Sequence, residues 1–252
     1  MKELGAVIYE GPSLIGDRSD VVGILIWKSA NVKTGDMIQL YVLPAKRSPL
    51  EALREDDNRG ACGDCKLQGA YDPERGKMVG RICYVNVGQA PEGIYRKYIT
   101  GGYPEFSKRL HRRHLQYRKI RLGAYGDPAA LPMGILRYLV RTCSRGHTGY
   151  THQVEDMTRR RADAIASVCM VSTETEAQRL AMQARGYRTF HVQPGAASPP
   201  PGDVECLFYT KHLQCRDCLR CKGADQRGPS IFVRGHGRTA ANLPQLVNNV
   251  HH

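Results

Sequence analysis

The chain has 252 residues, of which 41% are hydrophobic and 24% charged, so it can bury a core and has the composition of a globular protein. No apolar run approaches membrane-spanning length, and the start shows no signal-peptide pattern, so we expect no membrane partner. The formal net charge of +13 favours contact with nucleic acid or another anionic substrate.

The first sixty residues predict a β-rich segment. Apolar runs of strand length occur at 6–11, 21–27 and 37–43. The polar stretch between the last two predicts a hairpin turn with Gly35 at positive φ. Anion binding by this loop is the alternative, through Asn31, Lys33, Thr34 and Asp36.

From residue 118 onward, strand and helix patterns alternate. Alternating apolar residues at 118–125 predict a strand, and 131–143 predicts a helix with its apolar stripe at Ile135, Leu136, Leu139 and Val140. A short strand is expected at 147–153. The continuous apolar run at 162–171 predicts a strand covered on both faces.

A further helix and strand complete this alternating region. Thr173 and Glu176 form a T-x-x-E capping box, and Gly186 marks the helix end. The expected apolar stripe of this helix is Ala177, Leu180, Ala181 and Ala184. A strand is expected at 187–194, and one more apolar strand at 230–237. A stiff proline-rich linker at 198–203 leads to the C-terminal cysteines.

This repetition predicts βαβ units with a parallel sheet. We therefore expect an α/β fold with a partial (β/α) barrel-like parallel sheet at residues 61–197. An N-terminal β-rich segment precedes it at 1–60, and a C-terminal cysteine-rich metal-binding segment follows at 198–252.

Polar residues follow three of the expected parallel strands. In parallel α/β folds the ligand site lies at the carboxyl ends of the strands, so these residues are expected to converge. They are Tyr125, Gly126 and Asp127 after one strand, Tyr150, Thr151 and His152 after the next, and Ser172 and Thr173 after the third. Asp127, Tyr150 and His152 are the catalytic candidates.

Seven of the nine cysteines fall into two groups, and the odd total in CxxC-type pairs favours metal binding in a reducing cytoplasm over disulfides. The C-terminal group is C-x8-C-x2-C-x2-C, whose short spacings resemble a ferredoxin run. It predicts a closed four-cysteine iron–sulfur site, with a zinc ribbon or knuckle as the alternative. Its members are Cys206, Cys215, Cys218 and Cys221.

The N-terminal group consists of Cys62 and Cys65 in CGDC, with Cys83 farther along the chain. Three thiolates would leave one position open on a metal or cluster. The alternatives are a zinc site completed by His111 or His114, a redox CxxC pair, or a single site shared with a C-terminal cysteine. The remaining two, Cys143 and Cys169, are expected to be buried small hydrophobic residues.

Basic residues concentrate at 108–121 and 159–161. Such runs attract polyanions through phosphate neutralisation and counterion release, although a solvated helix face has the same pattern. The nucleic-acid candidates are Lys108, Arg109, Arg112, Arg113, Arg118 and Lys119.

The chain resembles a group of uncharacterised phage and plasmid proteins of similar size. The resemblance is carried by NVKTGDM at 31–37, CGDC with CYVNVGQ, RLGAYGDPAALP, TGYTHQ, and the C-terminal cysteines followed by GHG at 235–237. It implies a location in a bacterial host cytoplasm.

In layout the chain also resembles radical S-adenosylmethionine enzymes. Three cysteines with an aromatic residue after the last, a strand ending in a glycine-rich acidic motif, further βα units and a C-terminal auxiliary cluster occur in the same order. Here the cysteines are spaced more widely and Asp-Pro replaces the usual Glu. The resemblance implies a 4Fe-4S cluster on Cys62, Cys65 and Cys83, with S-adenosylmethionine contacts from Tyr84, Gly126 and Ser172.

The leading hypothesis is an iron–sulfur, radical-type enzyme acting on a nucleic acid or nucleotide. One alternative is a zinc-stabilised nucleic-acid-binding protein without catalysis. Another is a non-radical enzyme that modifies a nucleobase, with Asp127 as nucleophile or base and zinc in a structural role.

Overall fold

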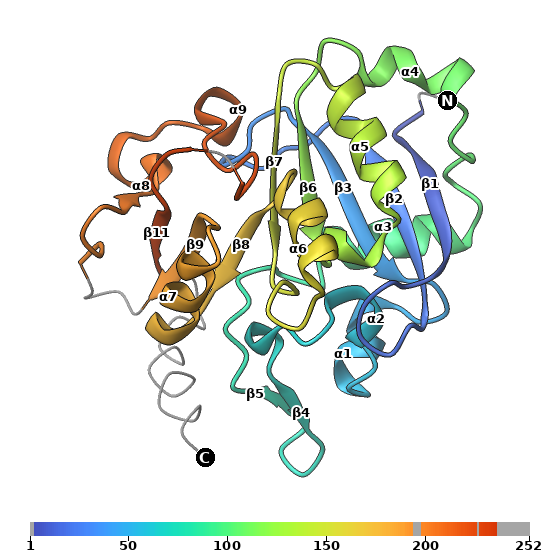
Figure 1. The fold of residues 1–252 in the computed structure, drawn as a ribbon. Coiled ribbons are helices and arrows are strands. Elements are labelled where there is room, and N and C mark those ends of the chain that lie inside the picture. Colours follow the sequence, from blue (N-terminus) through green and yellow to red (C-terminus); the bar gives the residue numbers. More distant parts are fainter. Residues whose placement is uncertain (1–2, 194–197, 226, 236–252) are drawn as a thin grey trace.

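The computed structural model describes residues 3–193, 198–225 and 227–235 (Figure 1). His236, in the GHG motif, lies outside this range. One nine-stranded sheet runs in the order β1-β2-β3-β6-β7-β8-β9-β11-β10, beside a two-stranded β4–β5 ribbon. The strands are β1 (Gly5–Pro12), β2 (Asp20–Ile26), β3 (Ile38–Pro44), β4 (Ala70–Asp72), β5 (Lys77–Val79), β6 (Ile120–Tyr125), β7 (His147–Thr151), β8 (Met170–Thr173), β9 (Thr189–Gln193), β10 (Val204–Glu205) and β11 (Ile231–Arg234).

The first three strands form an antiparallel meander, and β3 then pairs in parallel with β6. From there every neighbouring pair through β7, β8, β9, β11 and β10 is parallel. The carboxyl ends of these strands therefore share one edge of the sheet. Strands from all three expected segments of the chain belong to this one sheet.

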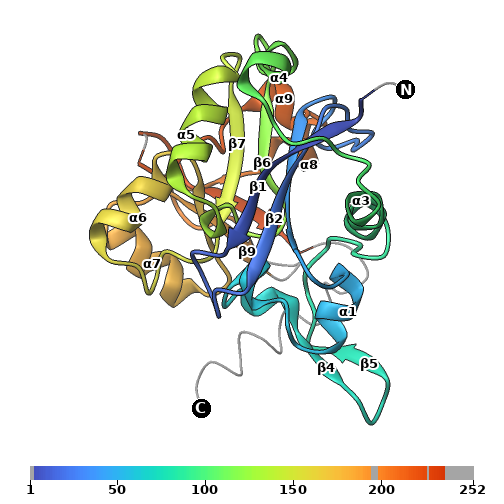
Figure 2. The same cartoon turned by 90° about the vertical axis from the view of Figure 1, so that its right-hand side faces the viewer.

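Helices connect and cover the strands. They are α1 (Pro49–Arg54), α2 (Arg59–Cys62), α3 (Ala90–Ile99), α4 (Lys108–Leu115), α5 (Met133–Thr142), α6 (Arg159–Ala166), α7 (Glu176–Ala184), α8 (Leu207–Lys211) and α9 (Cys215–Cys218), with short 3-10 turns at Lys66–Gln68 and Pro128–Ala130. In Figure 2, α5, α6 and α7 lie on one side of the sheet, and α1 and α3 lie on the other.

The connections β6–α5–β7 and β8–α7–β9 are expected βαβ units, and β7–α6–β8 is a third one whose helix was not expected. The mixed α/β class and the mostly parallel sheet are therefore confirmed. A barrel is not shown, because β1 and β10 stand at opposite ends of the strand order. In the described residues, no helix is both long and apolar enough to cross a membrane.

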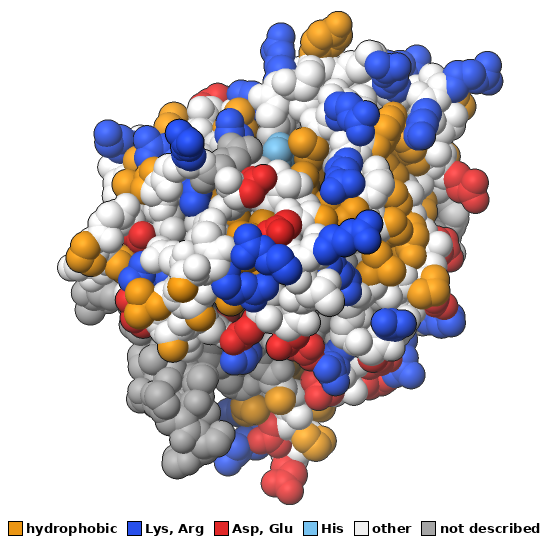
Figure 3. All heavy atoms as spheres, viewed as in Figure 1, with side chains coloured by type: hydrophobic (Ala, Val, Ile, Leu, Met, Phe, Trp, Pro, Cys, Tyr) orange, Lys and Arg blue, Asp and Glu red, His pale blue; other side chains and the backbone are white. Residues whose placement is uncertain are grey.

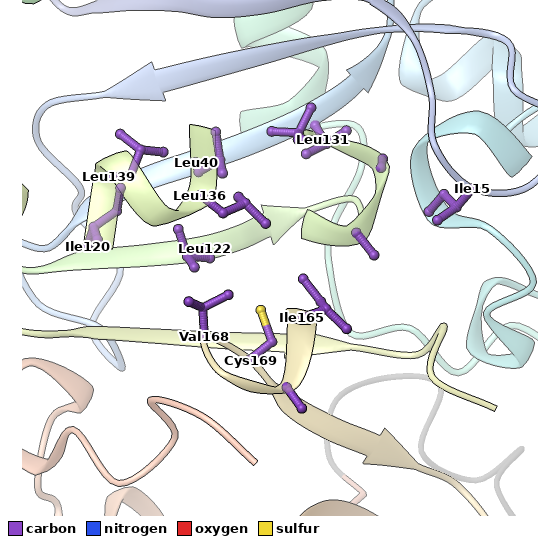
Figure 4. Packing of buried hydrophobic residues seen from close by; sticks show 14 of the residues in the cluster. Ile15, Leu40, Ile120, Leu122, Leu131, Leu136, Leu139, Ile165, Val168 and Cys169 are labelled. Atoms are coloured by element: carbon purple, nitrogen blue, oxygen red, sulfur yellow. The ribbon is translucent and has the colours of Figure 1, made fainter. Parts of the chain in front are cut away.

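The main core lies between the sheet and the α5–α6 layer (Figure 4). Leu122 of β6 and Leu136 and Leu139 of α5 are fully buried there, and Ile135 and Val140 pack against this cluster. The apolar stripe predicted for 131–143 is therefore confirmed. Cys143 and Cys169 are also fully buried, as expected of small hydrophobic residues.

The prediction of one strand over 162–171 was wrong. Residues through Ala166 belong to α6, and β8 begins only at Met170. Ala162, Ile165 and Ala166 are the buried residues of this helix, at helical spacing. The run 162–171 contains only two polar residues, Asp163 and Ser167, so the helical spacing of its buried residues could not be distinguished from a continuous apolar strand.

The start and the buried face of α7 also differ from expectation. Its N-cap is Thr175, whose side chain accepts the Gln178 N–H, while Thr173 belongs to β8. The buried residues of the helix are Arg179 and Met182. The expected stripe is exposed, with Leu180 retaining 53% of its accessible surface.

Candidate functional site

A pocket of about 110 Å³ opens on the face of the sheet opposite α5, α6 and α7. Its wall includes the first cysteine group and all the catalytic and cofactor candidates, but not Thr151 and Thr173, which were also expected at this edge. The candidates on the wall are Cys62, Cys65, Cys83, Tyr84, Gly126, Asp127, Tyr150, His152 and Ser172. The parallel strands explain the convergence, because they bring the segments after β6, β7 and β8 to one edge.

The CGDC turn is held against the ends of β6 and β7. Asp127 N–H donates to the Ala61 carbonyl at 2.7 Å, and the Gln153 side chain donates to the Cys62 carbonyl at 3.1 Å. Gly63 has φ 58°, and a Cβ there would lie 2.1 Å from the Gln153 side-chain oxygen. With ψ −140° this is a backbone conformation that residues with a side chain rarely adopt, so the turn favours glycine whether or not the Gln153 side chain can move away.

Cys83 reaches the CGDC turn because the β4–β5 hairpin closes the intervening loop. The backbone N–H groups of Ile82 and Cys83 both donate to the Leu67 carbonyl, at 3.0 and 2.8 Å. This brings Cys83 back beside Cys65 despite their separation in sequence. Leu67 and Ile82 form a small buried cluster against which both cysteines pack.

The three thiols lie close enough to influence one another. The pKa of the Cys62 thiol is raised well above its usual value, chiefly by burial and further by the neighbouring Cys65 and Cys83. The Asn58 amide donates to Cys62 Sγ at 3.1 Å and accepts the Tyr125 hydroxyl at 3.2 Å. Among the residues that the structure describes, no three Cys, His, Asp or Glu side chains are already arranged as ligands around one point.

His152 lies between the cysteines and an acidic partner. Its Nδ1 is 2.6 Å from Glu174 Oε1, and its ring also hydrogen-bonds to Cys65. Burial acts to lower the pKa of His152, but Cys65 and Glu174 outweigh it and raise this pKa well above its usual value. His152 and Cys65 also line a second cavity on their other side, which contains Glu174.

The second cysteine group comes together around β7 and the C-terminal strands. Cys206 follows β10, Cys215 and Cys218 are the first and last residues of α9, and the Cys221 carbonyl accepts the Gly149 N–H of β7 at 3.0 Å. Burial raises the pKa of Cys221 to about 12, and the other three thiols act in the same direction. All four thiols are thus near one another.

The polar loop at 29–37 is part of this second site. It connects the antiparallel strands β2 and β3, as a hairpin turn should, but its Lys33 carbonyl also accepts the Cys215 N–H at 2.8 Å. Burial raises the pKa of Cys215, whereas Arg121 and Lys33 act to lower it. Two cations therefore favour the thiolate form of this cysteine.

Arg121 and Tyr150 connect the two cysteine groups across the pocket. Both line it, Tyr150 hydrogen-bonds to Cys221, and the Arg121 guanidinium lies 5.2 Å from the centre of the Tyr150 ring. Arg121 also donates to the Tyr84 hydroxyl at 3.1 Å. The pocket is thus bordered by one cysteine group directly and by the other through these side chains.

Three residues of this site were not identified from the sequence as site residues: Asn58, Arg121 and Glu174. Glu174 follows β8 directly, so the strand-end argument contained a signal for it. Asn58 and Arg121 carried no comparable signal, because neither stands after a predicted strand.

The six basic nucleic-acid candidates divide into two sets. Lys108, Arg109, Arg112 and Arg113 project from α4 into solvent. In contrast, Arg118 donates to the carbonyls of Trp27 and Asp36, and Lys119 donates to the Arg216 carbonyl. In Figure 3, Lys and Arg side chains gather over α4 and the adjoining end of α5.

The two histidines of α4 lie apart from the cysteines. His114 stacks on Trp27 with ring centres 4.9 Å apart, and His111 accepts the Ser107 N–H and contacts Glu3. Because α4 precedes β6, it lies at the end of the sheet opposite the CGDC turn (Figure 1). A zinc site completed by His111 or His114 therefore has no support from the fold.

Comparison with known proteins gave no match, whether to protein-family models, to curated proteins or to solved structures. The functional argument thus depends on the geometry and chemistry of the site itself.

Proposed function

We propose that this chain is a metal-dependent enzyme whose reaction takes place in the pocket between the two cysteine groups. One observation carries the proposal: Cys62, Cys65 and Cys83 line the same pocket as Asp127 and His152. Soft thiolate ligands next to a histidine–carboxylate pair combine metal binding with proton transfer, which is an arrangement typical of an active site.

The donor set suits two different centres. Three cysteines at the pocket would hold a metal or iron–sulfur cluster with one position open to a ligand, and the four C-terminal cysteines would hold a closed centre. Burial raises the thiol pKa values, and a bound metal offsets this by stabilising the thiolates.

The side chains around the pocket would position the cysteines and transfer protons. Asn58 orients the Cys62 sulfur, and Gln153 fixes the CGDC turn. The His152–Glu174 pair holds a proton at the edge of the pocket, where it could be delivered to a bound substrate. The Asp127 carboxylate accepts the backbone N–H of His152 and so positions this residue.

The layout favours a radical S-adenosylmethionine-like enzyme acting on a nucleic acid or nucleotide. Cys62 and Cys65 lie between β3 and β6, Gly126–Asp127 and His152 follow β6 and β7, and Ser172 is one of the last two residues of β8. A 4Fe-4S cluster on the three cysteines would supply one-electron chemistry when bound. Tyr84, Gly126 and Ser172 would then contact S-adenosylmethionine.

Metal analysis followed by a cofactor assay tests this proposal. Protein purified without air should contain iron and acid-labile sulfide, and after reduction it should cleave S-adenosylmethionine. A Cys62→Ser variant should lose cleavage, whereas Cys143→Ser, at a buried cysteine outside both groups, should keep it. Iron without cleavage would reject the radical reaction, and colourless zinc protein would reject the iron–sulfur centre.

A second candidate function is nucleic-acid binding by the exposed residues of α4. The observation in its favour is that Lys108, Arg109, Arg112 and Arg113 all face solvent on one short helix. Phosphate neutralisation by such a surface gives binding that weakens steeply with salt. Titration with a duplex oligonucleotide at several salt concentrations tests it.

A further inference from the structure

Arg121 is a buried cation on the wall of the pocket. It lies in β6 on the same face as Gly123 and Tyr125, which also line the pocket, and only 7% of its surface is exposed. An arginine side chain stays protonated in proteins, so burial cannot be relieved by loss of the charge. Buried charges require a partner, because removing them from water is costly.

Among the described residues, Arg121 has no carboxylate partner, and the one thiol that acts on it, Cys215, belongs to the C-terminal centre, where a bound metal would share its charge. Its guanidinium donates to the Tyr84 hydroxyl, lies over the Tyr150 ring and is influenced by the Cys215 thiol. Within the part of the chain that the structure describes, no carboxylate is within ion-pairing distance of it.

A second buried arginine in the same chain has its charge balanced by carboxylates, as is usual for a buried charge. Arg179 is 6% exposed, and its guanidinium binds both oxygens of Glu176 and lies 3.5 Å from Asp203. Two arginines with similarly small exposed surfaces thus have different partners. Arg179 has two carboxylates beside it, whereas Arg121 has none among the described residues and lines the pocket.

We infer that Arg121 is an anion-recognition residue and that the pocket takes an organic anion, whose phosphate or carboxylate group pairs with this guanidinium. The planar fork of arginine suits two-point binding to either group. The rings of Tyr84, Tyr150 and Phe190 line the pocket beside it and would pack against the body of the ligand. This inference rests on the pocket being the substrate site of the proposed function, and it identifies the anionic group of the substrate and the residue that recognises it.

Titration of the purified protein with phenyl phosphate, benzoate and inorganic phosphate tests the inference. At least one of the two ring compounds should bind, and the tighter of the two identifies the anionic group. Arg121→Gln should weaken that binding about tenfold or more, since a charged hydrogen bond is removed. Arg121→Lys should weaken it less, and Arg141→Gln, at an exposed residue of α5, should leave it unchanged.

Two results would overturn the inference. One is failure of the wild-type protein to bind either ring compound. The other is an Arg121→Gln protein that binds them normally. If that protein has also lost metal, Arg121 instead balances the charge of the C-terminal thiolates. Metal content is measured on every sample, so anion binding by metal-free protein would leave this inference standing while rejecting the proposed function. If Arg121→Gln does not fold, the comparison of Arg121→Lys with wild type decides.

Discussion

The Asp127 carboxylate accepts the backbone N–H of His152 at 2.8 Å, so the chain after β6 is tied directly to the chain after β7. Its other oxygen accepts the Ala129 N–H at 2.9 Å, and the residue is only 4% exposed. Both oxygens therefore bind backbone donors. Asp127 thus positions His152, which itself lies beside Cys65 and Glu174.

Replacing Asp127 by Asn should destabilise the protein. One carboxylate oxygen becomes an NH₂ group, which cannot accept the N–H of His152 or Ala129, so a buried donor loses its acceptor. We expect the free energy of unfolding to fall by about 1–3 kcal/mol in urea denaturation. Asp156→Asn, at an exposed residue of the same region, should change it by less than about 0.5 kcal/mol. Equal stability of the two variants would contradict the positioning role.

His191 should make the protein less stable in mild acid. It is fully buried, its Nε2 has no hydrogen-bond partner in the described structure, and burial lowers its pKa. The unfolded chain therefore takes up a proton first, at a pKa of about 6.5, and stability falls as the pH drops below that value. Above that pH both states are neutral and the effect vanishes.

A His191→Gln variant tests this pH dependence. Between pH 7 and pH 5 its free energy of unfolding should fall less than that of wild type, by at most about 2 kcal/mol. Residual loss is expected from His147, whose pKa burial also lowers. An identical pH profile for the variant and wild type would show that His191 is not held neutral by the fold.

Two leucine substitutions test the assignment of helix faces. Leu136 of α5 is fully buried, so Leu136→Ala should lower the free energy of unfolding by about 2–5 kcal/mol. Leu180 of α7 is 53% exposed, so Leu180→Ala should change it by less than about 0.5 kcal/mol. Chemical denaturation measures both. A large loss at Leu180 would mean that the apolar stripe is buried after all.

The basic surface of α4 predicts salt-sensitive binding to nucleic acid. Each phosphate that the protein neutralises contributes about 0.9 to the slope of log affinity against log salt on duplex DNA. Replacing Arg109, Arg112 and Arg113 by Gln should therefore flatten the slope by about one unit for each phosphate that is no longer neutralised. Replacing Arg54, Arg75 and Lys77 by Gln, three exposed residues outside α4, is the control matched in charge. Weak binding that ignores salt would reject nucleic-acid binding by α4.

The sequence predicted which residues meet at the site, but not the backbone contacts that hold Cys83 there. Asp127, His152 and Ser172 each lie at or just after the end of a stretch that was predicted as a strand. Because these strands are parallel, their carboxyl ends share one edge of the sheet, and the three residues meet there. The position of Cys83 depended instead on the β4–β5 hairpin and the Leu67 carbonyl. Such long-range backbone contacts leave no periodic pattern in the sequence.

Two errors in the helices have one physical cause. Alanine is compatible with a strand, with a buried helix face and with an exposed one. Residues 162–171 were therefore predicted as a strand, and the alanines of α7 were predicted as its buried face. Arg179 shows the opposite effect, because a charged residue is buried there through its ion pairs with Glu176 and Asp203. The hydrophobic pattern of a sequence does not predict a buried charged residue whose charge is neutralised by neighbouring side chains.

Metal and sulfide content, measured in protein purified without air, tests the central claim most directly. Wild type is compared with a Cys62, Cys65 and Cys83 triple serine variant and with a variant lacking Cys206, Cys215, Cys218 and Cys221. The account predicts that each variant loses one of two centres and keeps the other. Wild-type protein without bound metal, or a triple variant with undiminished metal, would contradict it.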